Sequence, residues 1–155
     1  MVDEKAFSAS RDAFWQFGLY FKEVAAEYGL EKAMDLHAKA MRSYGEETAK
    51  AIRNSIGERV DLKSMASFFE EGLNAAGWDT RMIVEGPKSI VLRHSRCPEA
   101  EGLLQAGLDP RTVEARCRLS TETVTPYLRS LVPGMRIGVR KWNAPKSCDE
   151  ELVIE

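Results

Sequence analysis

The sequence has few of the residues that build metal and disulfide sites. It contains three cysteines and two histidines in 155 residues. A small, odd number of cysteines argues against a disulfide framework. The remaining roles for these thiols are a reactive nucleophile, a set of metal ligands or inert packing in the core.

The sequence also lacks a strong excess of charge and any long apolar run. The net charge is −2, so no basic surface for nucleic acid is expected. No apolar run reaches the roughly 20 residues that span a bilayer, and the acidic, polar start of the chain, residues 1–5, does not resemble a secretory signal. We therefore expect a cytoplasmic protein that binds a small molecule and neither nucleic acid nor membrane.

Several widespread catalytic motifs are missing. The sequence contains no Walker-type phosphate loop, no Gly-x-Gly-x-x-Gly, no Gly-x-Ser-x-Gly and no His-Glu-x-x-His. The common nucleotide enzymes, the α/β-hydrolases and the zincins are therefore not first choices.

What is present in the first half is helical periodicity. Apolar residues recur at helical spacing after Ser8 or Ser10, either of which can serve as N-cap, and Gly29 is a stop signal. Asp61 is a further N-cap candidate. The expected helices cover residues 6–28, 31–44, 46–56 and 61–76.

The second half reads differently. Two strands, 78–85 and 89–94, flank a turn at Gly86-Pro87, and two more, 135–142 and 148–154, close the chain. Three short helices are expected between these hairpins, at 98–105, 110–117 and 120–131. Together they predict one α+β domain over residues 1–155: a helical N-terminal half, then an antiparallel sheet of about four strands with inserted short helices.

Residues 93–98 are the most informative stretch. Cys97 follows an apolar strand and precedes Pro98, which fixes the first helical φ, so the thiol is expected at a helix N-terminus. The helix dipole and the neighbouring Arg93 and Arg96 favour thiolate there, and His94 is a candidate base. The alternative is an inert buried thiol that only caps the helix.

The same residues allow a second interpretation. His94, Cys97, Cys117 and Cys148 form a Cys3His set suited to tetrahedral zinc, although only its first half is compact. His94 also fits a strand residue that faces solvent or is satisfied within the sheet. Cys117, expected in the last turn of a helix, also fits core packing.

Two further patterns carry charge or aromatic groups. The acidic run 149–151 lies opposite a basic strand, which predicts cross-strand ion pairs or a carboxylate clamp through Arg136 or Arg140. The aromatic residues at 14–21 wrap more than one face of the first helix, which indicates a homodimer contact, a pocket wall or a fully buried helix.

Three landmarks together resemble a known family. They are Arg96-Cys97-Pro98 after a strand, residues 114–117 some twenty residues later, and Cys148 entering the last strand. The pattern is similar to the L-2-amino-thiazoline-4-carboxylic acid hydrolase-like family of small α+β proteins, and loosely similar to vinyl-4-reductase-type small-molecule-binding domains.

The resemblance implies hydrolytic opening of a cyclic C=N bond in a thiazoline carboxylate, with no cofactor required. Cys97 would add to the amidine-like carbon, with His94 or a carboxylate moving protons. An arginine would bind the substrate carboxylate, and the candidates are Arg93, Arg96 and Arg140. Two alternatives stay open: a zinc-type protein using Cys97, Cys117 and Cys148, and a small-molecule-binding domain without catalysis.

Overall fold

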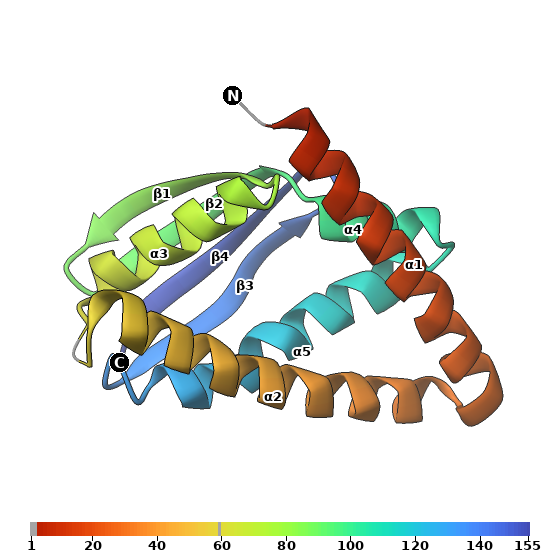
Figure 1. Ribbon diagram of the computed structural model, residues 1–155, viewed down its shortest axis with the longest axis horizontal. Helices are drawn as coiled ribbons and strands as arrows, with labels where there is room; N and C mark the ends of the chain where they lie inside the picture. Colours follow the sequence, from red (N-terminus) through yellow and green to blue (C-terminus); the bar gives the residue numbers. More distant parts are fainter. Residues whose placement is uncertain (1–2, 59) are drawn as a thin grey trace.

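The chain folds as three N-terminal helices followed by two β-hairpins with two helices inserted between them. The structure is a computed structural model that describes residues 3–58 and 60–155. Figure 1 shows the elements in chain order. Their bounds are α1 Glu4–Tyr28, α2 Leu30–Ile56, α3 Leu62–Ala75, β1 Asp79–Gly86, β2 Ser89–Arg96, α4 Pro98–Gln105, α5 Pro110–Leu128, β3 Met135–Asn143 and β4 Ser147–Ile154. The predicted α+β class is confirmed.

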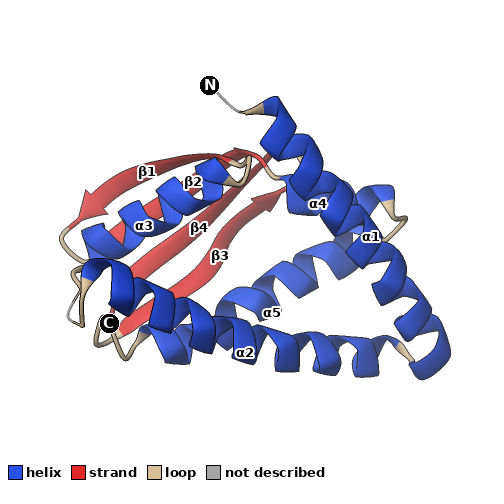
Figure 2. Ribbon diagram, viewed as in Figure 1, coloured by secondary structure: helices blue, strands red, loops and turns tan. Residues whose placement is uncertain are grey.

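The sheet is antiparallel throughout, with strand order β1-β2-β4-β3. The second and fourth strands in the chain are the central pair, so each hairpin contributes one inner and one edge strand (Figure 2). Their register sets His94 opposite Cys148. The two residues therefore come from hairpins far apart in sequence and meet in the middle of the sheet.

A hydrophobic core lies between one face of the sheet and α3 and α5. Leu92 and Leu152 from the inner strands pack with Met65 of α3 and Leu128 of α5, and all four are fully buried. Strand alternation sends their neighbours to the opposite face, where Arg93 and Asp149 form an ion pair. The charged run of β4 is thus split between two faces.

A second hydrophobic cluster joins α1 to α4. Phe21 of α1, Leu103 of α4 and Val113 of α5 pack there with the Cys97 side chain. The two helices approach so closely at Gly102 that a Cβ there would lie 2.4 Å from the backbone oxygen of Arg11. This crossing attaches the N-terminal helix to the segment that follows the candidate cysteine.

Two predicted helix breaks are wrong. The expected helices 31–44 and 46–56 are one helix, because α2 runs straight through Gly45. The expected helices 110–117 and 120–131 are likewise one, since α5 runs from Pro110 to Leu128. Cys117 therefore lies in the middle of a helix and not in its last turn.

The helix ends otherwise follow the sequence signals closely. Asp61 caps α3 through a 2.7 Å bond from the Ser64 amide, and Gly29 ends α1 at φ 90°. The expected N-cap of α1 at Ser8 or Ser10 is wrong, because Asp3 accepts hydrogen bonds from the first-turn amides and the helix begins at Glu4. The start of α1 was set by a capping aspartate nearer the N-terminus.

The aromatic residues of α1 divide between core and surface. Phe21 is 3% exposed, whereas Tyr20 is 68% exposed and Trp15 37%. Part of the aromatic cluster is therefore core, as expected, and the homodimer contact stays a prediction.

No helix in residues 3–58 and 60–155 is long and apolar enough to cross a membrane.

Candidate functional site

A small cavity joins the four side chains that the sequence singled out. Its volume is about 90 Å³. It is lined by Leu73, Trp78, His94, Cys97, Glu99, Cys117, Ser120, Thr121, Trp142, Cys148 and Glu150. Residues from β2, α4, α5 and β4 thus surround one space between the sheet and the helices.

Each cysteine reaches the cavity from a different element. Cys97 is the N-cap of α4, as predicted, and its sulfur accepts a 3.4 Å hydrogen bond from the Ala100 amide. Cys148 is in β4, directly opposite His94 of β2. Cys117 enters from the middle of α5. The convergence depends on tertiary packing, because 51 positions separate Cys97 from Cys148 in the sequence.

His94 is held by one hydrogen bond and faces a carboxylate on the other side of its ring. It is 3% exposed, its Nδ1 lies 2.8 Å from the Thr80 hydroxyl, and its Nε2 lies 3.6 Å from a Glu150 carboxylate oxygen. When the hydroxyl donates to Nδ1, the ring proton lies on Nε2, on the side of the carboxylate; when Nδ1–H donates to the hydroxyl oxygen, Nε2 is unprotonated. The Glu150 carboxylate is thus the nearest acidic group to Nε2.

A second carboxylate enters the cavity from α4. Glu99 pairs with the guanidinium of Arg116, and its Oε1 lies 3.9 Å from the Cys117 sulfur. Arg116 is only 5% exposed, and its Cζ lies 4.7 Å above the Phe17 ring. The buried guanidinium keeps Glu99 paired and holds negative charge beside the thiols.

The prediction of a thiolate at Cys97 in the free protein is wrong. Burial of the thiol, reinforced by the charge of Glu99, raises its pKa well above the ordinary value, and the helix amide opposes this only in part. Burial likewise raises the pKa of Cys117, and that of Cys148 to about 12. In all three cases burial favours the protonated thiol over the thiolate.

The zinc interpretation receives no geometric support from the described residues. Within residues 3–58 and 60–155, no three His, Cys, Asp or Glu side chains are grouped closely enough to hold a metal ion. The candidate ligands His94, Cys97, Cys117 and Cys148 share one cavity without forming such a group.

The three predicted substrate-binding arginines lie away from the cavity. Arg93 forms a bidentate pair with Asp149, and Arg140, at a bulge in β3, binds Glu85, both on the opposite face of the sheet. The Arg96 guanidinium lies 2.6 Å from Glu4 and 3.7 Å from the centre of the Phe7 ring, at the start of α1. Arg93 points away from the cavity because alternate strand residues face opposite ways. Arg140 lies at the β3 bulge, and Arg96, at the end of β2, pairs with the start of α1.

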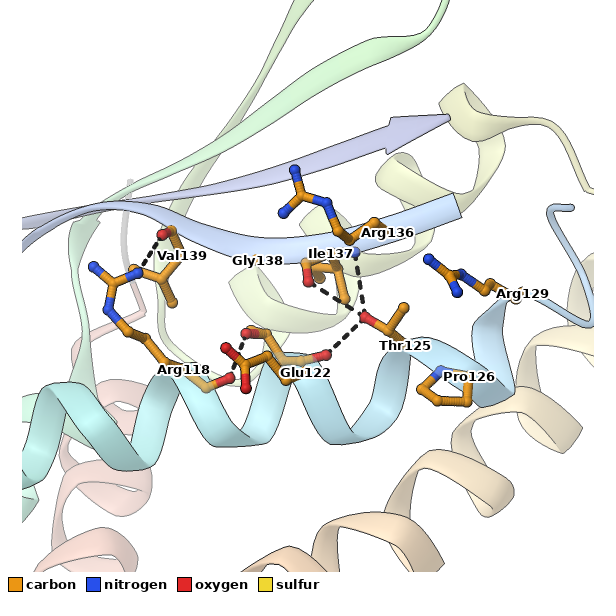
Figure 3. Close-up of a pocket in the computed structure, with 10 residues that line it drawn as sticks. Arg118, Glu122, Thr125, Pro126, Arg129, Arg136, Ile137, Gly138 and Val139 are labelled. Carbon is orange, nitrogen blue, oxygen red and sulfur yellow. Dashed lines mark hydrogen bonds between the residues drawn. The ribbon is translucent and has the colours of Figure 1, made fainter. Parts of the chain in front are cut away.

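A larger cleft of about 380 Å³ adjoins the cavity, between α5 and the edge strand β3. Thr121 lines both spaces. Figure 3 shows Arg118 reaching from α5 to the β3 backbone at one end of the cleft, and Arg129 at the other end. Thr125, between them, hydrogen-bonds to the backbone of Ile137.

The family comparison agrees with this arrangement. The family described as L-2-amino-thiazoline-4-carboxylic acid hydrolase matches residues 9–127, more than three quarters of the chain. The chain belongs to this family. The match includes the segments that carry His94, Cys97 and Cys117 and ends before Cys148. No curated protein matches the sequence.

In this thiazoline hydrolase family member, sequence reasoning missed two residues of the site. Glu99 carried a usable signal, since it follows the capping Cys97 by two positions in the first turn of α4. Thr80 carried none, because only the β1–β2 register places it beside His94. Glu150 was noted only within an acidic run, and strand alternation puts it on the same face as Cys148.

Proposed function

We propose that the chain hydrolyses a small cyclic amidine acid of the thiazoline carboxylate class, with the reacting ring in the cavity that Cys97 lines. One observation carries this proposal: a buried thiol, a histidine and two carboxylates line a single small cavity. Perturbed ionisable groups gathered in a cavity are typical of catalytic sites. The family assignment supplies the reaction class.

The charges around the cavity suit an amidine. An amidine is basic and carries a proton and positive charge at neutral pH, and Glu99 and Glu150 provide the matching negative charge. The volume is also appropriate, because a cavity of roughly 150 Å³ admits benzene and this one, at about 90 Å³, admits no more than a single small ring. A bulkier or anionic ring is excluded.

The bound cation also changes the state of Cys97. Its pKa is raised in the free protein by burial and by negative charge. A positive amidinium beside the sulfur offsets both effects and lowers the pKa of the thiol. The thiolate is thus formed when the substrate is present, which protects the empty site from other electrophiles and oxidants.

The chemistry then follows in two stages. The Cys97 sulfur adds to the amidine carbon while its proton passes to Glu150, and the C=N electron pair moves to the ring nitrogen. The C=N bond then re-forms as the bond from that carbon to the other ring heteroatom breaks, and the departing heteroatom takes the proton from Glu150. Water next adds to the carbon and gives a proton to Glu150, the bond from the carbon to the Cys97 sulfur breaks, and the departing sulfur recovers that proton. His94, hydrogen-bonded on its other side by Thr80, orients Glu150 and shares its proton.

Replacement of Cys97 by Ala tests this scheme. We expect the ring-opening rate with 2-amino-2-thiazoline-4-carboxylic acid to fall by at least about 1,000-fold. The matched control is Cys117→Ala, which removes a thiol from the same cavity that has no part in the scheme. Unchanged turnover by the Cys97 variant would rule out covalent catalysis by this residue. Absence of turnover by the unsubstituted protein would favour a binding domain without catalysis.

A further inference from the structure

The geometry points to Arg118 as the residue that binds the carboxylate of the substrate, at the mouth of the cysteine cavity. This inference rests on the proposed function and identifies the missing partner of the acid group. Its basis is the placement of Arg118 in the cleft that shares Thr121 with the cavity. Of the arginines named from the sequence, Arg93, Arg96 and Arg140 line neither space, and Arg136 lines the cleft but pairs with Glu151 and Glu155.

The Arg118 guanidinium is held in a fixed orientation by two partners. Its Nε and one terminal nitrogen donate to the same Glu114 oxygen at 2.9 and 2.7 Å, and the other terminal nitrogen donates to the Val139 backbone oxygen at 2.7 Å. Glu114 lies one turn earlier in α5, and the bond to Val139 fixes the side chain against β3. An arginine held in this way is preorganised for a ligand.

Two N–H bonds of Arg118 remain available for a ligand. The guanidinium carries five N–H groups, and three of them donate within the described residues. The other two belong to the two terminal nitrogens, one on each. A carboxylate accepts such a pair of N–H groups in a bidentate arrangement. The side chain is 41% exposed, so an acid can reach it from the cleft.

The other arginines of the cleft are less suitable. Arg129 donates to the Met135 backbone oxygen and lies 3.6 Å from Glu155, and Arg136 binds Glu155 and Glu151. Both lie toward the other end of the cleft from Arg118 (Figure 3). Arg118 lies one helical turn before Thr121, the residue that lines both the cleft and the cavity. Glu122, on the same wall, is exposed and screened by solvent.

Arg118 also lies near enough to the cavity for its charge to act weakly on a thiol there. Its positive charge opposes the rise in the pKa of Cys148, a residue of the cavity and not of the cleft. A ligand that spans Thr121 would therefore meet Arg118 at one end and the glutamates at the other. The preferred substrate class is a zwitterion: a cationic cyclic amidine bearing a carboxylate on an adjacent ring carbon.

Arg118→Gln tests this assignment with two ligands that differ only in the carboxylate. Affinities of the full-length chain for 2-amino-2-thiazoline-4-carboxylic acid and for 2-amino-2-thiazoline are measured by isothermal titration calorimetry. We expect the unsubstituted protein to prefer the acid by about 10- to 100-fold and the variant to lose this preference. The affinity of the variant for 2-amino-2-thiazoline, which lacks the carboxylate, should be unchanged. Arg129→Gln, in the same cleft and at the C-cap of the same helix, is the control and should keep the preference.

Turnover of the acid is measured in parallel, so that the two proposals can fail separately. If the unsubstituted protein prefers the acid and Arg118→Gln abolishes this preference, but the acid is not turned over, the role of Arg118 stands and the proposed hydrolase activity is overturned. Equal affinity of the unsubstituted protein for the two ligands, including no binding of either, would overturn the role of Arg118. An equal loss of the preference for the acid in the Arg129→Gln variant would also overturn the role of Arg118. If the glutamine variant does not fold, Arg118→Lys is used in its place. Lysine keeps the charge but cannot bind a carboxylate in a bidentate arrangement, so this variant should lose part of the preference for the acid.

Discussion

At the scale of single residues, Cys97 shows two opposing influences on one thiol. Its place at the N-terminus of α4 was predictable from Pro98, and this position favours a thiolate. Burial and the carboxylate of Glu99 act in the other direction and dominate. Sequence could indicate the helix end but not the burial, because the cavity walls come from β4 and α5. In the proposed mechanism, the positive charge of the substrate lowers the pKa of this thiol.

His37 provides a residue-scale prediction about stability and pH. Burial, with help from the charge of Arg116, lowers its pKa from 6.5 to about 4, and its Nε2 lies 2.8 Å from the Ser120 hydroxyl. A depressed pKa means that the unfolded chain binds a proton first as the pH falls. The contribution of neutral His37 is therefore complete above pH 6.5 and is lost progressively down to about pH 4.

The matched comparison is His37→Gln, which retains a hydrogen-bonding side chain and does not titrate. We expect the free energy of unfolding of the unsubstituted protein, relative to this variant, to fall by on the order of 1–2 kcal/mol between pH 7 and pH 4. Urea denaturation at several pH values measures the difference. A difference that does not vary with pH would show that His37 titrates normally.

At the scale of elements, glycine has two meanings in this chain, and sequence alone did not separate them. Gly29 ends a helix at a positive φ, as predicted. Gly45 was predicted to do the same and instead lies inside α2, where a Cβ would be 2.8 Å from the Tyr127 ring of α5. Gly45 has no side chain, and this lets α2 approach α5 closely, a contact that depends on a residue 82 positions away.

Ser120 was predicted to start a helix and instead lies inside α5, where its hydroxyl donates to the Arg116 backbone oxygen.

Gly102 is the clearest test of such a contact. A Cβ at this position would meet the Arg11 backbone oxygen at 2.4 Å and the Trp15 backbone nitrogen at 2.7 Å, so α1 and α4 must separate to admit it. We expect Gly102→Ala to destabilise the fold by about 1–3 kcal/mol, measured by urea denaturation. Gly72→Ala is the control, because a Cβ there meets nothing within 4 Å and alanine should stabilise α3 by about 0.5–1 kcal/mol. Equal effects of the two substitutions would contradict the close crossing.

At the scale of the whole molecule, the N-terminal helices and the sheet are joined through the elements that form the site. The α1 helix packs against α4 and α2 packs against α5, and these two inserted helices carry Cys97, Glu99 and Cys117. The class of fold, the hairpins and most helix ends were predictable from local patterns. The strand order that brings β2 beside β4 was not, because long-range pairing has no local signal.

The same strand order explains why the cavity and its acid-binding end could not be assembled from the sequence. His94 and Glu150 meet only through pairing of the two inner strands. Arg118 reaches the cleft only because α5 is continuous past Cys117. The sequence pointed to a cysteine and a histidine that both line the cavity, whereas Arg93, Arg96 and Arg140 lie away from it. Strand register and packing, and not position along the chain, decide which side chains meet.

Mass spectrometry of the whole chain, acid-quenched during turnover of 2-amino-2-thiazoline-4-carboxylic acid, tests the central claim most directly. Covalent catalysis predicts an adduct of the mass of the substrate, located on the peptide that contains Cys97 and absent from the Cys97→Ala protein. Turnover by the unsubstituted protein with no adduct at any quench time, together with full activity of Cys97→Ala, would contradict the claim.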